Sequence, residues 1–225
     1  MKLSVIIPVF NEEDTLEELL NRVLEVDVEK EIIIVDDCST DGSRKILESL
    51  DNDMVKVLYQ EKNQGRGAAI RAGLKEATGT IVVNQDADLE YDPSEYLKLL
   101  EPILSGSADV VYGSRFKGNV QSILFISLLA NKFLVFITRV LFGCGITDLM
   151  TCYKMFKTDV LKSLDLKTDG FDFEVELTSK VLKSGYHIVE VPITFKGRSF
   201  AEGKKINSRD FFIVLRSLLK HRFST

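Results

Sequence analysis

The chain has 225 residues, of which 45% are hydrophobic and 28% charged, so it can bury a core and is not broadly disordered. Its net charge of −5, without any stripe of Lys and Arg with interleaved aromatics, excludes a nucleic-acid binder by bulk electrostatics. Only two histidines nearly exclude a His-based zinc site or a Ser-His-Asp triad, and three cysteines without a CxxC motif fit a reduced, cytosolic protein.

Strands and helices alternate along the first half of the chain. Apolar runs predict strands at 3–9, 31–37 and 54–60, at a segment that begins with Ile81, and at 108–113. Helices are predicted between them, within 11–26, 38–50, 67–77 and 92–104. The last of these helices is predicted to start with Asp92 as N-cap, Pro93 at the first position and Glu95 closing a capping box. This order predicts an α/β fold with a mostly parallel central sheet flanked by helices, and ligands beyond the carboxyl ends of its strands.

The pattern changes after residue 113. Two further strands are predicted at 151–157 and 187–196, with a helix around Val175–Lys183 between them. A basic, amphipathic helix is predicted over 211–223. Residues 196–222 contain eight Lys or Arg and two acids, a local balance of +6 in an acidic chain.

Residues 120–142 are densely apolar and include Lys132 and Arg139. A transmembrane span would place Lys132 near the bilayer centre, at a cost of about 2.5–3.5 kcal/mol. We therefore expect a helix or helix pair in the membrane interface, with both cations reaching the headgroups. A core helix or a dimer-interface helix is the alternative, and it leaves homo-oligomerisation open.

Three acids at alternate positions, Asp86, Asp88 and Glu90, follow the strand that begins at Ile81. In an extended segment alternate side chains point the same way, so these carboxylates can converge. Converging carboxylates repel unless a cation lies between them, and a hard divalent ion such as Mg²⁺ or Mn²⁺ suits oxygen ligands. The residues alone also allow a solvated turn.

Four ordered segments decide between these interpretations: "SVIIPVFNEEDTLEELL", "IIIVDDCSTDGS", "NQGRGAAIRAGLKEATG" and "VVNQDADLEYDP". Together they resemble the family-2 inverting glycosyltransferases of GT-A type, in particular the branch of dolichyl-phosphate mannosyltransferases and bacterial polyprenyl-phosphate sugar transferases. The resemblance implies a GT-A-like nucleotide-binding fold and one glycosyltransferase domain over 1–225. Residues 1–115 would form the nucleotide-sugar-binding half, and residues 116–225 the acceptor-binding, membrane-proximal half.

The resemblance also implies a donor pocket and a metal site. A GDP- or UDP-sugar would contact Pro8, Phe10, Glu12, Asp37, Asn63, Gly65, Arg66 and Asp86. Asp88 and Glu90 fall on the two metal-ligand positions, the second of which is often glutamine in this branch. From the residues alone, two glycines before a helix suggest a loop that cradles phosphate. The third glycine of a dinucleotide fingerprint is missing, so we reject a dehydrogenase.

An acceptor phosphate would require cations against this acidic pocket. Arg115 in "YGSRFKG" is one candidate, and "GRSFAEGKK", which resembles the branch's basic loop, supplies Arg198, Lys204 and Lys205. A phosphate acceptor is already an anion, whereas a hydroxyl acceptor would need a general base. Asp148 falls on an acid of the family's pattern, where Cys152 replaces glycine and Lys154 replaces arginine; it could orient the acceptor, act as base or cap a turn.

These observations lead to one main hypothesis. We expect an inverting, metal-dependent transfer of a hexose from a nucleotide-diphospho-sugar to a polyprenyl phosphate, at the cytoplasmic face of the membrane. The residues expected to carry it are Asp86, Asp88, Arg115, Asp148 and Arg198. The alternatives are a hydroxyl-bearing acceptor with Asp148 as base, and a sugar-nucleotide-binding regulator without turnover.

Overall fold

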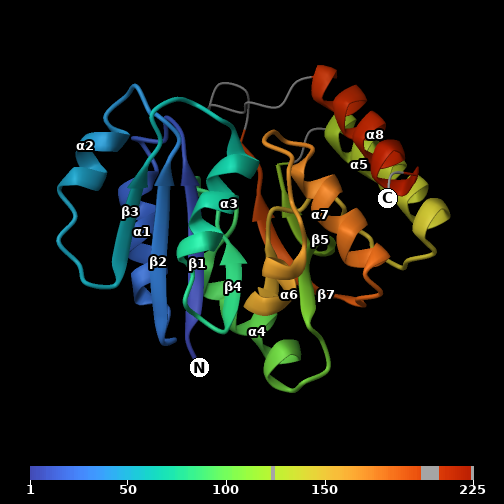
Figure 1. The fold of residues 1–225 in the computed structure, drawn as a ribbon, viewed down its shortest axis with the longest axis horizontal. Coiled ribbons are helices and arrows are strands. Elements are labelled where there is room, and N and C mark those ends of the chain that lie inside the picture. Colours follow the sequence, from blue (N-terminus) through green and yellow to red (C-terminus); the bar gives the residue numbers. More distant parts are fainter. Residues whose placement is uncertain (123–124, 199–207, 224–225) are drawn as a thin grey trace.

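The computed structural model describes residues 1–122, 125–198 and 208–223. Within these residues, seven strands form one sheet in the order β3-β2-β1-β4-β6-β5-β7 (Figure 1). The strands are β1 (Leu3–Val9), β2 (Lys30–Asp36), β3 (Val55–Tyr59), β4 (Ile81–Asn84), β5 (Val110–Gln121), β6 (Lys154–Lys157) and β7 (Ile188–Lys196). β6 runs antiparallel to its neighbours β4 and β5, and the other pairs are parallel. The α/β class with a mostly parallel sheet is therefore confirmed.

Helices cover both faces of this sheet (Figure 1). They are α1 (Leu16–Glu25), α2 (Ser43–Glu48), α3 (Arg66–Glu76), α4 (Tyr96–Leu104), α5 (Phe125–Phe142), α6 (Thr158–Ser163), α7 (Phe173–Lys183) and α8 (Ser208–Phe223). The helices α1 and α4 contribute to the core on one face, and α3, α6 and α7 to the core on the other. The sheet is thus the middle of three layers.

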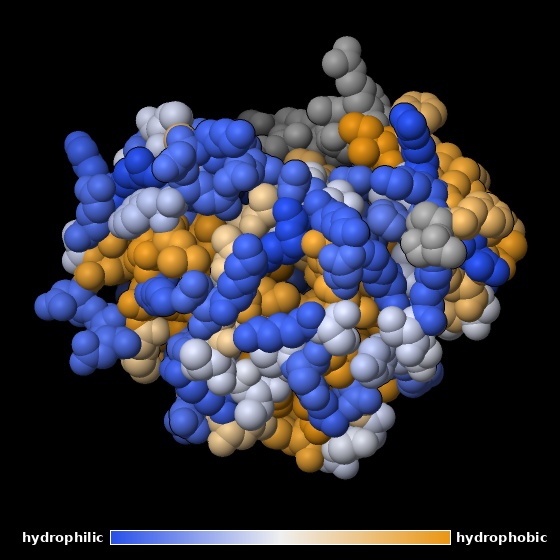
Figure 2. Space-filling model, in the orientation of Figure 1, coloured by the Kyte–Doolittle hydropathy of each residue, from blue (hydrophilic) through white to orange (hydrophobic). Residues whose placement is uncertain are grey.

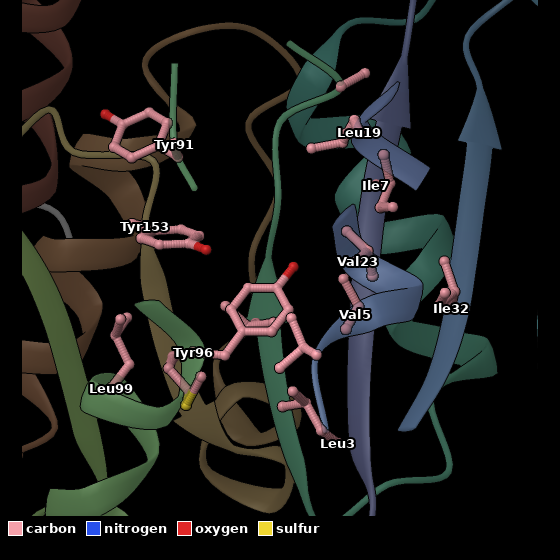
Figure 3. Close-up of a cluster of buried hydrophobic side chains, with 14 of the residues drawn as sticks. Leu3, Val5, Ile7, Leu19, Val23, Ile32, Tyr91, Tyr96, Leu99 and Tyr153 are labelled. Atoms are coloured by element: carbon pink, nitrogen blue, oxygen red, sulfur yellow. The ribbon is translucent and has the colours of Figure 1, made fainter. Parts of the chain in front are cut away.

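β1 shows how the sequence produces these layers. Successive side chains of a strand point to opposite faces, and β1 is buried on both. Leu3, Val5 and Ile7 face the α1 side, where Leu19 and Val23 pack near them (Figure 3). Ile6 belongs instead to the cluster that includes α3. Such two-sided burial explains why the strand is almost continuously apolar.

The start of α4 differs in one detail from the prediction. Asp92 is the N-cap of a 3₁₀ turn, Pro93–Glu95, and its carboxylate accepts a hydrogen bond from the backbone N–H of Ser94. The predicted capping box is wrong, because the carboxylate of Glu95 accepts from the N–H of Thr194 on β7 instead. Glu95 thereby links the start of α4 to β7.

Parallel strands bring their carboxyl ends to one edge of the sheet. β1, β2 and β4 are mutually parallel neighbours, and β7 pairs in parallel with β5. The end of β7 also reaches the loop after β4, because Tyr91 forms a bridge with Phe195 and the N–H of Lys196 donates to the carbonyl of Glu90. The segments that carry the predicted site residues therefore share one edge.

α5 and α8 lie side by side at one edge of the molecule (Figure 1). The ring centroids of Phe133 and Phe211 are 6.0 Å apart, and Arg222 Nε donates to the carbonyl of Leu141 at 2.8 Å. Apolar atoms gather on the surface there (Figure 2). No helix of the described residues combines the length and the apolar character that crossing a membrane requires.

Candidate active site

Three acids converge on one arginine at the carboxyl edge of the sheet. Arg198 Nη2 lies 2.6 Å from Asp88 Oδ2, and Arg198 Nη1 lies 2.9 Å from Glu12 Oε2. The backbone N–H of Arg198 donates to Glu90 Oε1 at 2.7 Å. Asp88 and Glu90, two of the three acids predicted to converge, thus meet Glu12 from the loop after β1 at Arg198, whereas Asp86 pairs with Arg66.

Burial and neighbouring acids change the pKa of Asp88. Its side chain is buried, and burial together with the charges of Asp86 and Glu90 raises the pKa of the Asp88 carboxyl to about 8, against the opposing effect of Arg198. The backbone N–H of Glu90 donates to Asp88 Oδ1 at 3.1 Å. The guanidinium of Arg198 therefore does not offset the combined effect of burial and the neighbouring acids.

Asp86 faces a different cation. Arg66 Nε donates to Asp86 Oδ1 at 2.9 Å, and the same guanidinium bonds Glu174 of α7. Glu174 also pairs with Lys154 of β6, which is fully buried and lies 4.8 Å from the ring centroid of Tyr112. A chain of alternating charges thus runs from the predicted donor site into the core, and it holds the carboxylate of Asp86.

Arg115 and Asp148 form a second buried pair. Asp148 Oδ2 accepts from Arg115 Nε, Asp148 Oδ1 accepts from Arg115 Nη2, and both distances are 2.7 Å. Asp148 is 0% exposed and also accepts from the backbone N–H of Arg115. The guanidinium carbon of Arg115 lies 5.0 Å from the ring centroid of Phe195, three residues before Arg198. The strand end that leads to Arg198 thus lies beside Arg115.

The loop before α3 is packed against the chain rather than open. Asp37 accepts from the backbone N–H groups of Gln64 and Gly65, at 2.7 and 2.8 Å. Gly65 has a φ of +96°, and a Cβ there would lie 2.5 Å from the carbonyl oxygen of Asp169. That carbonyl also accepts from the N–H of Gly67 at 2.7 Å. The glycines therefore permit a close approach of 168–170, and this geometry does not support the predicted phosphate cradle.

The remaining predicted donor residues lie around these loops. Pro8 near the end of β1 and Phe10 after it are partly buried, whereas Asn63 is exposed. Backbone N–H groups of the loop after β1 donate to side chains at the start of α2 and in the loop before it: Glu12 N to Ser43 Oγ at 2.9 Å and Glu13 N to Asp41 Oδ2 at 3.1 Å. The two loops are thus joined, with Glu12 directed toward Arg198.

Comparison with known proteins places this geometry in a family. Residues 4–165 match the model of Glycosyl transferase family 2. The chain belongs to that family. It is 33% identical over 215 residues to polyprenol monophosphomannose synthase of Mycolicibacterium smegmatis, covering 91% of this chain and 81% of the relative. It is also 33% identical to dolichol-phosphate mannosyltransferase of Pyrococcus furiosus, over 98% of this chain but only 63% of that longer protein.

The fold has similar solved structures. The glycosyltransferase aligns with glucosyl-3-phosphoglycerate synthase from Mycobacterium tuberculosis in complex with Mn²⁺, UDP and glucosyl-3-phosphoglycerate, with a TM-score of 0.74 at 20% identity. The alignment covers 98% of this chain and 79% of that one. The GT-A-like fold expected from the sequence is confirmed.

The acidic side chains around Arg198 in this glycosyltransferase carry the kind of oxygen atoms that bind metal ions. In the described part of the chain, no set of three or more His, Cys, Asp or Glu side chains is arranged to hold a metal ion as it stands. The oxygens of Asp88 and Glu90 are nevertheless hard ligands, and they already contact a cationic residue. Together with Glu12, these carboxylates surround one residue and offer several oxygen ligands at one place. These residues therefore fit Mg²⁺ or Mn²⁺.

Sequence reasoning missed two acids that organise this site. Glu174 holds Arg66, and Glu190 of β7 accepts from the backbone N–H groups of Thr147 and Asp148, at 2.7 and 3.0 Å. Neither lies in a motif at the carboxyl end of a strand, and only their position among apolar residues of the sequence could have indicated a role. The predicted acceptor residues Lys204 and Lys205 lie outside the described residues.

Proposed function

We propose that this glycosyltransferase transfers a hexose, with mannose as the first candidate, from a nucleotide-diphospho-sugar to a polyprenyl phosphate, with inversion at the anomeric carbon. Two sequence relatives are named for mannosyl transfer to a polyprenol or dolichol carrier, and each is similar to nearly the whole chain. The proposal extends their acceptor class to this chain.

The observation that carries the acceptor proposal is the pair between Arg115 and Asp148. Both carboxylate oxygens of Asp148 are engaged by Arg115, and the carboxylate is fully buried. A general base needs access to the proton that it removes. Asp148 is therefore better suited to orienting Arg115 than to activating a hydroxyl acceptor, which disfavours the hydroxyl alternative.

Arg115 is well placed to hold an acceptor phosphate. A guanidinium has five N–H donors, and the pair with Asp148 uses the Nε and Nη2 groups. The same side chain can therefore bind a phosphate oxygen while Asp148 keeps it oriented. An anionic phosphate oxygen can attack the sugar without a base, so this arrangement needs no further proton acceptor.

The donor is proposed to bind on the other side of Phe195. Asp88 and Glu90 would hold a Mg²⁺ or Mn²⁺ ion, which when bound neutralises charge on the leaving diphosphate. Asp86, which is held by Arg66, would contact the sugar or its phosphates. Glu12, Asp37 and Asn63 would line the part of the pocket that binds the nucleotide. Glucosyl-3-phosphoglycerate synthase, which shares the fold, has been solved with Mn²⁺ and UDP, and this supports a metal-dependent donor site here.

The exposed faces of α5 and α8 support a peripheral position at the membrane, for which we propose the cytoplasmic side. Large apolar side chains are exposed on both helices: Leu129, Phe133, Phe136, Val140, Phe212, Ile213, Leu219 and Phe223. The four on α5 recur at a spacing of three or four residues and so share a face. The basic residues Arg216 and Lys220 are exposed on α8. An apolar face with neighbouring cations is typical of a helix that lies in an anionic membrane surface.

A product assay tests this function. The protein is incubated with Mn²⁺ and GDP-mannose, or with UDP-hexoses, and offered either a short polyprenyl phosphate or the corresponding polyprenol. We expect sugar in the organic phase only with the phosphorylated lipid. Transfer to the polyprenol alone would favour the hydroxyl acceptor, and donor binding without any transfer would favour a regulator.

A further inference from the structure

Arg198 occupies the position where the metal ligands meet. Its guanidinium contacts Asp88 and Glu12 at 2.6 and 2.9 Å, and its backbone N–H contacts Glu90 at 2.7 Å. Its side chain is only 19% exposed, so it is directed into the protein rather than extended into solvent. A single residue thus satisfies three carboxylates through two different groups.

A metal ion could not join this arrangement unchanged. Asp88 Oδ2 and Glu90 Oε1 each accept a hydrogen bond from Arg198, and the side chain of Asp88 is only 9% exposed. A divalent ion coordinated by the same oxygens at about 2.0–2.2 Å would displace those hydrogens. It would also repel a guanidinium held against its ligands.

We propose that Arg198 is an internal substitute for the metal: it stabilises the acids when the ion is absent, and it must leave Asp88 when the ion binds. This inference rests on the proposed function, because it takes Asp88 and Glu90 as the metal ligands. Binding of the metal and the contact between Arg198 and Asp88 are then mutually exclusive. By linkage, each weakens the other by the same factor.

The exchange would have a consequence for the acceptor side. Arg198 follows directly from the end of β7, where Phe195 lies 5.0 Å from the guanidinium carbon of Arg115. Once displaced from the acids, Arg198 is a cation available to a phosphate near Arg115. The metal would thereby convert a residue that neutralises the empty donor site into one that attracts an anionic substrate.

The first test measures Mn²⁺ binding alone, by the electron paramagnetic resonance signal of free Mn²⁺, without donor or acceptor. Arg198→Ala should bind Mn²⁺ about five- to 150-fold more tightly than the wild type, and Arg198→Lys should lie between them. Lys196→Ala is the matched control, because it removes an exposed charge two residues away that has no side-chain contact with these acids among the hydrogen bonds and ion pairs described. If Lys196→Ala tightened Mn²⁺ binding equally, long-range repulsion would explain the effect, and the proposed exchange between Arg198 and the metal would be wrong.

A second test uses the wild type and does not depend on any variant folding. Phenylglyoxal modifies accessible arginines, and peptide mass spectrometry locates them. Saturating Mn²⁺ should increase modification of Arg198 several-fold and leave Arg115, held by Asp148, unchanged. If Mn²⁺ binds but Arg198 becomes no more accessible, the proposal that Arg198 takes the place of the metal is refuted, even where lipid-linked sugar is made. If no lipid-linked sugar is made while the exchange occurs, the proposed function fails instead.

Discussion

Asp148 accepts a hydrogen bond from Arg115 at each of its two carboxylate oxygens, and each oxygen lies 2.7 Å from a guanidinium nitrogen. The pair is itself supported from β7, because Glu190 accepts from the backbone N–H of Asp148. Burial lowers the pKa of Arg115, whereas the neighbouring charge of Asp148 raises it, and the net effect is a pKa above the ordinary value of an arginine. Arg115 is therefore a permanent and fixed cation.

Asp148→Asn should loosen this cation. We expect the KM for polyprenyl phosphate to rise about tenfold or more, with a much smaller change in the KM for the donor, because the lost interaction orients the acceptor site. Steady-state kinetics with each substrate varied in turn measures both. A general base would behave differently: kcat would fall with little change in either KM. Asp109→Asn, which breaks the half-exposed pair with Lys157, serves as control.

Lys154 and Glu174, in the chain of charges that leads to Asp86, should contribute to the free energy of unfolding in a coupled way. Lys154 is fully buried against Glu174, so Lys154→Met leaves a buried carboxylate with one partner fewer and should cost about 3–5 kcal/mol of unfolding free energy. Adding Glu174→Gln should recover part of that loss. A double-mutant cycle by urea denaturation checks this. Strictly additive losses would mean that the two side chains do not interact.

The strands of the sheet could be predicted from the sequence, whereas the contacts between the charged residues of the site could not. The apolar run from Leu3 to Val9 was sufficient to predict β1, because a local pattern determines it. The pairs of Arg66 with Glu174 and of Arg115 with Asp148 join residues more than thirty positions apart. No local pattern encodes such contacts, so the sequence indicated the charged residues and not their partners.

The glycine-rich loop illustrates a second limit. Two glycines before a helix are compatible both with a phosphate and with a closely packed segment. Only the tertiary structure shows that the carbonyl of Asp169 lies at Gly65 and Gly67. The family resemblance supplied the predicted metal ligands, but it gave no reason to expect Arg198 between them.

Glu176 should make stability depend on pH. Burial alone would raise its pKa, but hydrogen bonds from Lys180 and from the backbone of Lys167 and Thr168 lower it to about 2, from an ordinary value of 4.5. A carboxyl with a lowered pKa stabilises the fold fully above its unfolded pKa and loses that effect as pH falls through its folded pKa. We therefore expect about 1–3 kcal/mol of stability to disappear between pH 4.5 and 2.

Glu176→Gln should show this contribution directly. The variant should be less stable at pH 7 by about the same amount, and the difference from the wild type should shrink as the pH approaches 2. Chemical denaturation at several pH values measures it. Glu101→Gln, on the exposed side of α4, is the control and should leave the pH profile unchanged. A difference that stays constant with pH would contradict the assignment to Glu176.

Membrane attachment should depend on the exposed face of α5. Phe136 and Val140 are 61% and 66% exposed and lie one turn apart. Replacing both with Glu removes apolar area and adds charge, and should lower co-sedimentation with anionic vesicles about tenfold or more. Leu104→Glu on α4 changes a residue that is 58% exposed outside this surface and should have little effect. Equal binding by both variants would place the contact elsewhere.

The most direct test of the account is the rate of sugar transfer to a short polyprenyl phosphate as Mn²⁺ is varied, in the wild type and in Asp88→Asn. Transfer by the wild type should rise with Mn²⁺ to saturation and should be abolished by a chelator. Asp88→Asn should lose about 100-fold or more in rate at any Mn²⁺ concentration. Transfer that persists in the chelator, or that is unchanged in Asp88→Asn, would contradict a metal-dependent transfer in which Asp88 is a ligand.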